Sequence, residues 1–180
     1  MVDWITIDVF KACFPLCKFK HEDLFPFLTA AMDEKEINTP ERIAAFWSQI
    51  AHESGELNYW VELGSDDSFK KYDGRMGNGP GEGAKYRGRG PFQLTGKNNY
   101  KKYGDLLGVD LINSPELAGR AENGFRIAAL YWDLNKLNDL ADWYWFDKIT
   151  QAINGGQNGA DARRKYYVKF LPIITAAQDQ

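Results

Sequence analysis

A glycine-rich middle segment constrains the fold of this chain more than any other feature. More than half of its 17 glycines lie between Gly55 and Gly96, a density typical of turns and of closely approaching backbone. Residues 1–55 and 98–180 instead carry apolar residues at helical spacing. Helices are expected over four later segments: 98–107, 122–136, 145–154 and 160–177. Pro172 is expected to kink or interrupt the last of them, and a short hairpin could pair 85–87 with 92–94. The pattern predicts a mainly α (α+β) fold.

Size and charge exclude several classes of protein. The 180 residues are expected to form one catalytic domain over 1–180, with no separate binding module. A chain of this size buries about 70% of its surface, enough for a core without disulfides or metals. The net charge of −3 differs from that of a general nucleic-acid binder. No apolar stretch is long enough to enter a membrane. No signal peptide is visible, so synthesis in a cytoplasm is expected.

The segment 39–55 has the marks of a well-defined helix. Thr39 is a good N-cap, Pro40 suits the first helical position, and Gly55 suits the position after the last turn. The apolar residues within it recur at helical spacing and form one stripe: Ile43, Phe46, Trp47 and Ile50. Glu53 continues this stripe at the C-terminal end of the helix, so we expect its carboxyl group to be partly buried.

A carboxyl group at that position favours its neutral form. Partial desolvation and the negative end of the helix dipole both disfavour the carboxylate. A carboxylic acid that stays protonated near neutral pH can serve as a general acid. Glu53 is therefore a candidate proton donor.

Further carboxylates follow in the glycine-rich segment. Glu62 comes nine residues after Glu53, and Asp66, Asp67 and Glu82 lie further on. Two carboxyl groups, one neutral and one charged, are the minimum equipment for cleaving a glycosidic bond. The spacing alone leaves the second carboxylate open among Glu62, Asp66, Asp67 and Glu82.

Other catalytic chemistries lack their residues. His52-Glu53 would begin a zinc-protease motif, but Glu56 stands where the second histidine belongs. With two histidines and two cysteines in the chain, no metal site is expected. No nucleophilic serine elbow is present.

Several blocks together resemble family 19 of the glycoside hydrolases, which includes plant-type chitinases and many bacteriophage endolysins. Residues 44–55 read AAFWSQIAHESG and residues 86–96 read YRGRGPFQLTG, followed by Asn99-Tyr100. Residues 113–118 read NSPELA, and residues 153–156 read INGG with Arg163 downstream. The blocks occur in the family's order and cover roughly 38–170.

The resemblance implies a lysozyme-like helical fold of two lobes, with a small β element beside the cleft, and hydrolysis with inversion and no cofactor. It makes Glu53 the general acid, points to Glu62 as the second carboxylate, and matches Thr95 to the residue that positions the attacking water. Inversion would place the two carboxyl groups about 6.5–9.5 Å apart. Positions that line or support the sugar site are matched by Gln93, Asn99, Asn154 and Arg163. Tyr86 is a candidate for stacking on a sugar or for core packing. Trp132, Trp143 and Trp145 are expected to pack in the core or between the two lobes.

The catalytic residues do not choose between chitin and peptidoglycan, because both contain β-1,4-linked N-acetylated sugars. The missing signal peptide and disulfides favour an endolysin, a monomer made in the host cytoplasm that acts on the wall after release. Six cations between Lys85 and Lys102 would suit an anionic wall polymer, although they could equally form salt bridges. A chitinase is the alternative within the class, and a noncatalytic wall-binding or virion protein is the alternative outside it.

Overall fold

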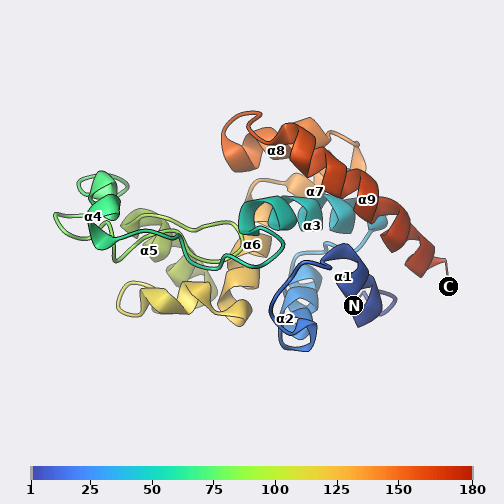
Figure 1. Ribbon diagram of the computed structural model, residues 1–180, viewed down its shortest axis with the longest axis horizontal. Coiled ribbons are helices and arrows are strands. Elements are labelled where there is room, and N and C mark those ends of the chain that lie inside the picture. The colour runs from blue at the N-terminus through green and yellow to red at the C-terminus, as the bar shows by residue number, and fades with distance from the viewer. Residues whose placement is uncertain (1, 180) are drawn as a thin grey trace. The chain divides into compact units, whose positions relative to one another are not determined.

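The computed structural model describes residues 2–179, which divide into two compact units (Figure 1). The first unit contains residues up to Asn58 and from Ala129 onward, and the second runs from Tyr59 to Ala128. Most of the structure is helical, as predicted. No helix within 2–179 combines the length and the apolar character needed to cross a membrane.

The helices follow one another along the chain as α1 (Ile7–Cys13), α2 (His21–Glu34), α3 (Pro40–Ser54), α4 (Asp66–Phe69), the 3-10 helix η1 (Lys70–Tyr72), α5 (Lys97–Leu107), the 3-10 helix η2 (Pro115–Gly119), α6 (Ala121–Leu134), α7 (Leu137–Asp142), α8 (Phe146–Asn154) and α9 (Ala160–Gln178). Helix α6 begins in the second unit and ends in the first.

Helix α3 begins and ends where the sequence predicts. The Thr39 hydroxyl accepts a hydrogen bond from Arg42 N at 3.3 Å, which satisfies one of the free donors of the first turn. Gly55 ends the helix in the left-handed conformation, with φ of 56°. The whole predicted stripe is buried. Because α3 is buried over most of its length, it is the central helix of the first unit.

Aromatic rings fix the neighbours of α3. Trp47 lies 5.6 Å from Phe10 and 5.7 Å from Phe14, measured between ring centroids, and Phe46 lies 5.2 Å from Trp132. Helices α3 and α9 pack along each other more extensively than any other pair, as Figure 1 shows. The prediction that Trp132 belongs to the core is confirmed.

The predicted later helices are found, with two differences. Helix α9 continues through Pro172 without a break. Pro172 cannot bond to the carbonyl of Val168, but Val168 is 64% exposed, so water can reach that end of the turn. The helix expected at 122–136 ends at Leu134, because Lys136 adopts a left-handed conformation, φ 53°, and a separate helix, α7, follows.

The β element of the second unit consists of single bridges and is smaller than the predicted hairpin. Its described residues form isolated antiparallel bridges, Val61 with Arg89 and Arg89 with Leu94. The pairing of 85–87 with 92–94 is wrong, because Tyr86 N donates to Glu82 O at 3.1 Å and so closes a turn instead of a strand. These bridges hold the Glu62 segment against the loop at 88–94.

Candidate functional site

Glu53 lies at the C-terminal end of α3 in a network of buried polar side chains. Its carboxylate forms an ion pair with the guanidinium of Arg163, whose side chain is 2% exposed against 23% for Glu53. Arg163 also donates to Gln49 Oε1 at 2.5 Å, and Gln49 Nε2 donates to the Thr150 hydroxyl at 3.2 Å. The network therefore fixes the orientation of Glu53 from three helices, while the neutral form of its carboxyl group stays a prediction.

Helical spacing brings these groups together. Gln49 and Glu53 are four residues apart on α3, so they share one face of the helix. Thr150 and Asn154 have the same relation on α8. Within residues 2–179, the buried Asn154 Nδ2 and Arg163 Nε atoms have no hydrogen-bond partner. A bound water or substrate oxygen would satisfy such donors.

His52 and Tyr131 complete the surroundings of Glu53. Burial, followed by the charge of Arg163, lowers the pKa of His52, although the carboxylate of Glu53 opposes this shift. Burial and the charge of Glu53 raise the pKa of Tyr131, whose hydroxyl donates to Ala152 O at 2.6 Å. Both side chains are therefore held neutral near pH 7.

Glu62 lies in the second unit and has different surroundings. One carboxylate oxygen accepts hydrogen bonds from the Tyr72 hydroxyl at 2.9 Å and from Lys71 Nζ at 3.2 Å, and the other accepts from Gly88 N at 3.1 Å. Burial raises the pKa of Glu62, but these three hydrogen bonds and the charge of Lys71 outweigh it, so the pKa falls below its ordinary value. Glu62 is therefore a charged carboxylate, suited to act as a base.

The loop beside Glu62 carries two of the predicted site residues, Gln93 and Thr95, and a third, Asn99, lies in the first turn of α5. Gln93 has a left-handed backbone, φ 51°, and its amide donates to Gly90 O at 3.0 Å. Thr95 donates to Gln93 O at 2.8 Å, and Asn99 donates to Thr95 O at 2.8 Å. A Cβ atom on Gly88 would lie 2.7 Å from Gln93 Oε1 and 3.3 Å from Glu62 Oε2. Glycine at 88 therefore lets Gln93 and Glu62 approach the same point of the backbone.

Tyr86 does not form a sugar platform. It is completely buried, its hydroxyl donates to Ile112 O at 3.2 Å, and its ring lies 5.3 Å from that of Tyr100. Stacking on a sugar would need an exposed ring face, so Tyr86 is a core residue of the second unit.

The other candidate carboxylates have structural partners. Asp66 pairs with Arg87 at 2.7 Å and Asp67 with Lys70 at 2.6 Å, both on the surface of α4. Glu82 accepts from Gly79 N at 2.7 Å and pairs with Lys97 at 2.8 Å, which closes the glycine loop. Glu62 is the candidate whose hydrogen bonds connect it to the loop of Gln93 and Thr95.

The cations between Lys85 and Lys102 are largely engaged within the protein. Besides the pairs of Arg87 and Lys97, Arg89 donates to Tyr100 Oη at 2.7 Å, and Lys101 pairs with Asp105 at 2.8 Å. Salt bridges and hydrogen bonds thus account for most of this run, which weakens it as a binding surface for an anionic polymer.

Sequence reasoning missed several groups around the two glutamates. Gln49, Thr150 and Tyr131 surround Glu53, while Tyr72 and Lys71 bind Glu62. Gln49 could have been found from the sequence, because it stands one helical turn before Glu53 and so shares its face of α3. The two glutamates have different partners, a buried arginine for one and three donors, one of them the partly exposed Lys71, for the other. The predicted separation of their carboxyl groups stays a prediction.

Comparisons with known proteins point to one family. Residues 19–142 match the family model described as chitinase class I, Glyco_hydro_19. A Haemophilus influenzae protein described as containing a glycosyl hydrolase family 19 domain is 37% identical over 157 residues, covering 69% of this chain and 76% of that protein. An acidic 27 kDa endochitinase of Solanum lycopersicum is 37% identical over 166 residues, 76% of this chain and 65% of its own. An endochitinase of Arabidopsis thaliana matches over 47% of its length, so the chain spans about half to two thirds of these plant relatives.

Solved structures agree in fold. The crystal structure of a bacterial family 19 chitinase superimposes with a TM-score of 0.79 at 25% identity, over 95% of both chains. Chitinase C from Streptomyces griseus superimposes with a TM-score of 0.77 at 25% identity, over 96% of this chain and 93% of the other. The predicted lysozyme-like, mainly helical fold is confirmed by these neighbours.

Proposed function

Since the chain belongs to glycoside hydrolase family 19 and is therefore a glycosidase, we propose that it hydrolyses the β-1,4 glycosidic bonds of bacterial peptidoglycan as an endolysin. In this proposal residues 1–180 act as one catalytic domain and as a monomer. The enzyme is made in the cytoplasm of the infected host and reaches the wall on release. No cofactor takes part.

Glu53 is the general acid of the proposed reaction. It protonates the oxygen of the leaving sugar, and Glu62 takes a proton from the water that attacks the opposite face of the ring. The observation that carries this assignment is the buried network of Arg163, Gln49 and Thr150, which holds the carboxyl group of Glu53 in one orientation. Thr95, at the end of the loop beside Glu62, and Asn99, in the first turn of α5, would position the water and the sugar.

The lowered pKa of Glu62 supports its role as the base. A base must be charged at the working pH, and the hydrogen bonds from Tyr72, Lys71 and Gly88 stabilise that form. The pKa of Glu62 in the folded protein lies below its ordinary value of 4.5. Glu62 therefore contributes stability above pH 4.5 that is lost as the pH falls through its folded pKa.

Peptidoglycan is preferred to chitin because its peptides add negative charge, and cations line a groove on the surface of α9. Chitin is the second candidate, and the names of the plant relatives, which are endochitinases, favour it. Both polymers would present the same bond to Glu53.

Mass spectrometry of digests separates the two substrates. We expect purified protein to release glycan fragments with new reducing ends from purified peptidoglycan sacculi, faster than it cleaves chitin oligomers of matched length. Reduction of the new ends followed by fragmentation in the mass spectrometer identifies the sugar at the reducing end, and thus the bond that is cut, and the anomer of the fresh product should be inverted. Cleavage of chitin oligomers with intact sacculi would contradict the peptidoglycan proposal and support the chitinase alternative.

Tyr72→Phe should move the acidic limb of the profile of kcat/KM against pH to higher pH. The change removes one hydrogen bond to the Glu62 carboxylate, so the pKa of Glu62 should rise. We expect kcat/KM of the wild type to persist until the pH falls below about 4.5, and the variant to lose activity at higher pH.

Tyr166→Phe is the matched control for this shift. It removes a tyrosine hydrogen bond to a different glutamate, Glu56, at 3.2 Å, and should leave the acidic limb in place. If Tyr72→Phe leaves the limb where the wild type has it, Glu62 is not the group that titrates there.

A further inference from the structure

The turn between α7 and α8 exposes three aromatic side chains in a row. Trp143 and Tyr144 are each 69% exposed and Trp145 is 48% exposed. The prediction that Trp143 and Trp145 belong to the core is wrong, because the turn at Tyr144, φ 57°, carries them outward. Backbone hydrogen bonds from Tyr144 to Ala141 at 3.0 Å and from Trp145 to Leu140 at 2.8 Å hold the turn. This aromatic turn is therefore a fixed apolar surface, unusual for an exposed turn.

The aromatic turn is separate from the carboxylate network of the first unit. Asp142, at the end of α7, pairs with Arg42 at 2.5 Å, in the first turn of α3. Glu53 lies eleven residues further along the same helix, which corresponds to about 16 Å. The rings of the aromatic turn thus lie near the end of α3 opposite to Glu53.

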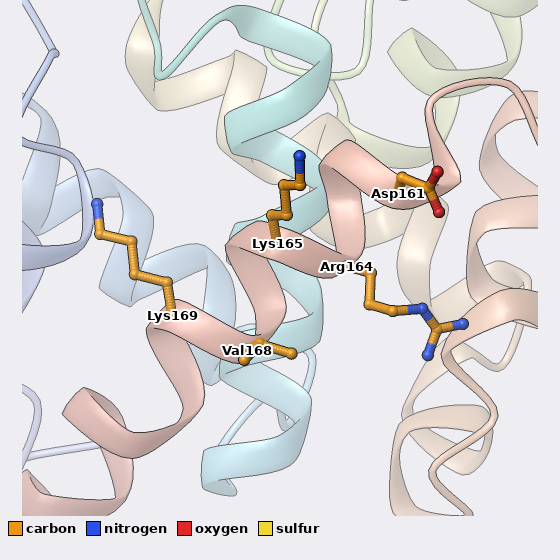
Figure 2. Close-up of a pocket in the computed structure, with 5 residues that line it drawn as sticks. All are labelled: Asp161, Arg164, Lys165, Val168 and Lys169. Carbon is orange, nitrogen blue, oxygen red and sulfur yellow. The ribbon is translucent and has the colours of Figure 1, made fainter.

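A cationic groove runs along the outer face of α9. This open hollow has a volume of about 480 Å³ and is lined by side chains of α9 alone: Asp161, Arg164, Lys165, Val168 and Lys169. Figure 2 shows how these side chains spread from the helix. Within residues 2–179, Lys165 and Lys169 form no ion pair, and Val168 adds an exposed apolar surface between the charges. The groove therefore offers two positive charges outside any ion pair, with the carboxylate of Asp161 at one end of it, so it carries a small net positive charge.

An ion pair joins the groove to the aromatic turn. Arg164, on the groove, pairs with Asp147 of α8, two residues after Trp145. Lys148, the next residue, places its Nζ atom 3.7 Å from the centre of the Trp145 ring. Arg164 thus connects the side of α9 that faces α8 with the segment that follows the aromatic turn, while Lys165 and Lys169 point to the other side of α9 (Figure 2).

We propose that the aromatic turn and the cationic groove of α9 form an accessory binding surface for an anionic β-1,4-linked glycan strand, outside the catalytic residues. The apolar faces of the sugars would stack on Trp143 and Tyr144, since aromatic rings offer large, flat contact areas at small entropic cost. Carboxylates of the attached peptides would pair with Lys165 and Lys169. The choice of an anionic strand over neutral chitin follows from these two charges and rests on the proposed function.

Binding to purified peptidoglycan sacculi tests the surface. All variants are made in a Glu53→Gln background, so that the wall is not digested during sedimentation. We expect Trp143→Ala with Tyr144→Ala, and separately Lys165→Glu with Lys169→Glu, each to weaken sacculus binding about tenfold. The charge variant should also remove most of the dependence of binding on salt concentration.

Two matched controls change the same chemistry elsewhere on the first unit. Phe19→Ala removes an exposed ring, 49% exposed in the wild type, and Lys18→Glu with Lys20→Glu makes the same charge change on an exposed loop. Both should bind sacculi as the Glu53→Gln parent does, and thermal melts should show that every variant is folded.

The same surface substitutions in an enzyme that keeps Glu53 separate this inference from the proposed function. These active variants should cleave short soluble oligosaccharides at the wild-type rate and sacculi more slowly. Sacculus binding that is unchanged in both surface variants overturns the inference. A loss of rate on short oligosaccharides as large as the loss on sacculi overturns it too. A wild-type enzyme that binds sacculi through this surface but cleaves only chitin contradicts the proposed function and leaves the binding surface supported.

Discussion

Replacement of Glu53 by Gln should reduce hydrolysis by about 10²- to 10⁴-fold, the range contributed by a positioned general acid. The amide has nearly the same shape as the carboxyl group but no proton to give to the leaving sugar. Its oxygen can still accept the hydrogen bond from Arg163, so the buried network around Gln49 should survive. The rate should fall and the protein should stay folded at the assay temperature, with a lower melting temperature because the buried Arg163 guanidinium keeps its hydrogen bonds but loses its counter-charge.

The measurement is the initial rate of cleavage of a soluble oligosaccharide, with circular dichroism melts of the same samples. Glu41→Gln is the control, because it makes the same chemical change on the same helix, in its first turn. It should keep the parental rate. A Glu53→Gln enzyme that retains most of the wild-type rate would remove Glu53 from the reaction.

Local features of the fold were predictable from the sequence. The boundaries of α3 follow from Thr39, Pro40 and Gly55, and these signals act within one turn of the helix. The apolar stripe also places Glu53 at the correct edge of the buried face, since helical periodicity depends on the spacing of residues alone. The motif resemblance adds the family, which the comparisons confirm.

Contacts between distant segments were not predictable in the same way. Gln49 and Thr150 are 101 residues apart, and Arg163 meets Gln49 across 114 residues. No local pattern encodes such partners, because they depend on how α3, α8 and α9 pack. Tyr86 and Trp143 show the same limit: both are aromatic residues in a polar context, yet one is fully buried and the other is exposed.

Removal of the Arg163 guanidinium should both destabilise the protein and impair the general acid. In Arg163→Met, the buried Gln49 Oε1 and the Glu53 carboxylate lose their shared donor. Breaking a buried ion pair costs about 3–5 kcal/mol. Because the Glu53 side chain is 23% exposed, water can replace part of the lost interaction, so we expect about 2–3 kcal/mol in the free energy of unfolding.

Urea denaturation measures this loss, and Arg164→Met is the control. Arg164 is the next residue on α9, but its side chain is 51% exposed and pairs with Asp147 on the surface, so its removal should cost at most about 1 kcal/mol. On a short soluble oligosaccharide, Arg164→Met should keep the parental rate, whereas Arg163→Met should lower kcat with little change in KM, because the orientation of Glu53 is lost.

Arg163→Lys distinguishes positioning from mere stability. Lysine keeps the charge but lacks the planar fork that donates to Gln49 and Glu53 together. It should recover part of the unfolding free energy and only a small part of kcat. Full recovery of kcat by lysine would show that charge alone, and not the orientation of the Glu53 carboxyl group by the guanidinium, is what the reaction needs. An Arg163→Met protein as stable as the wild type would contradict the network itself.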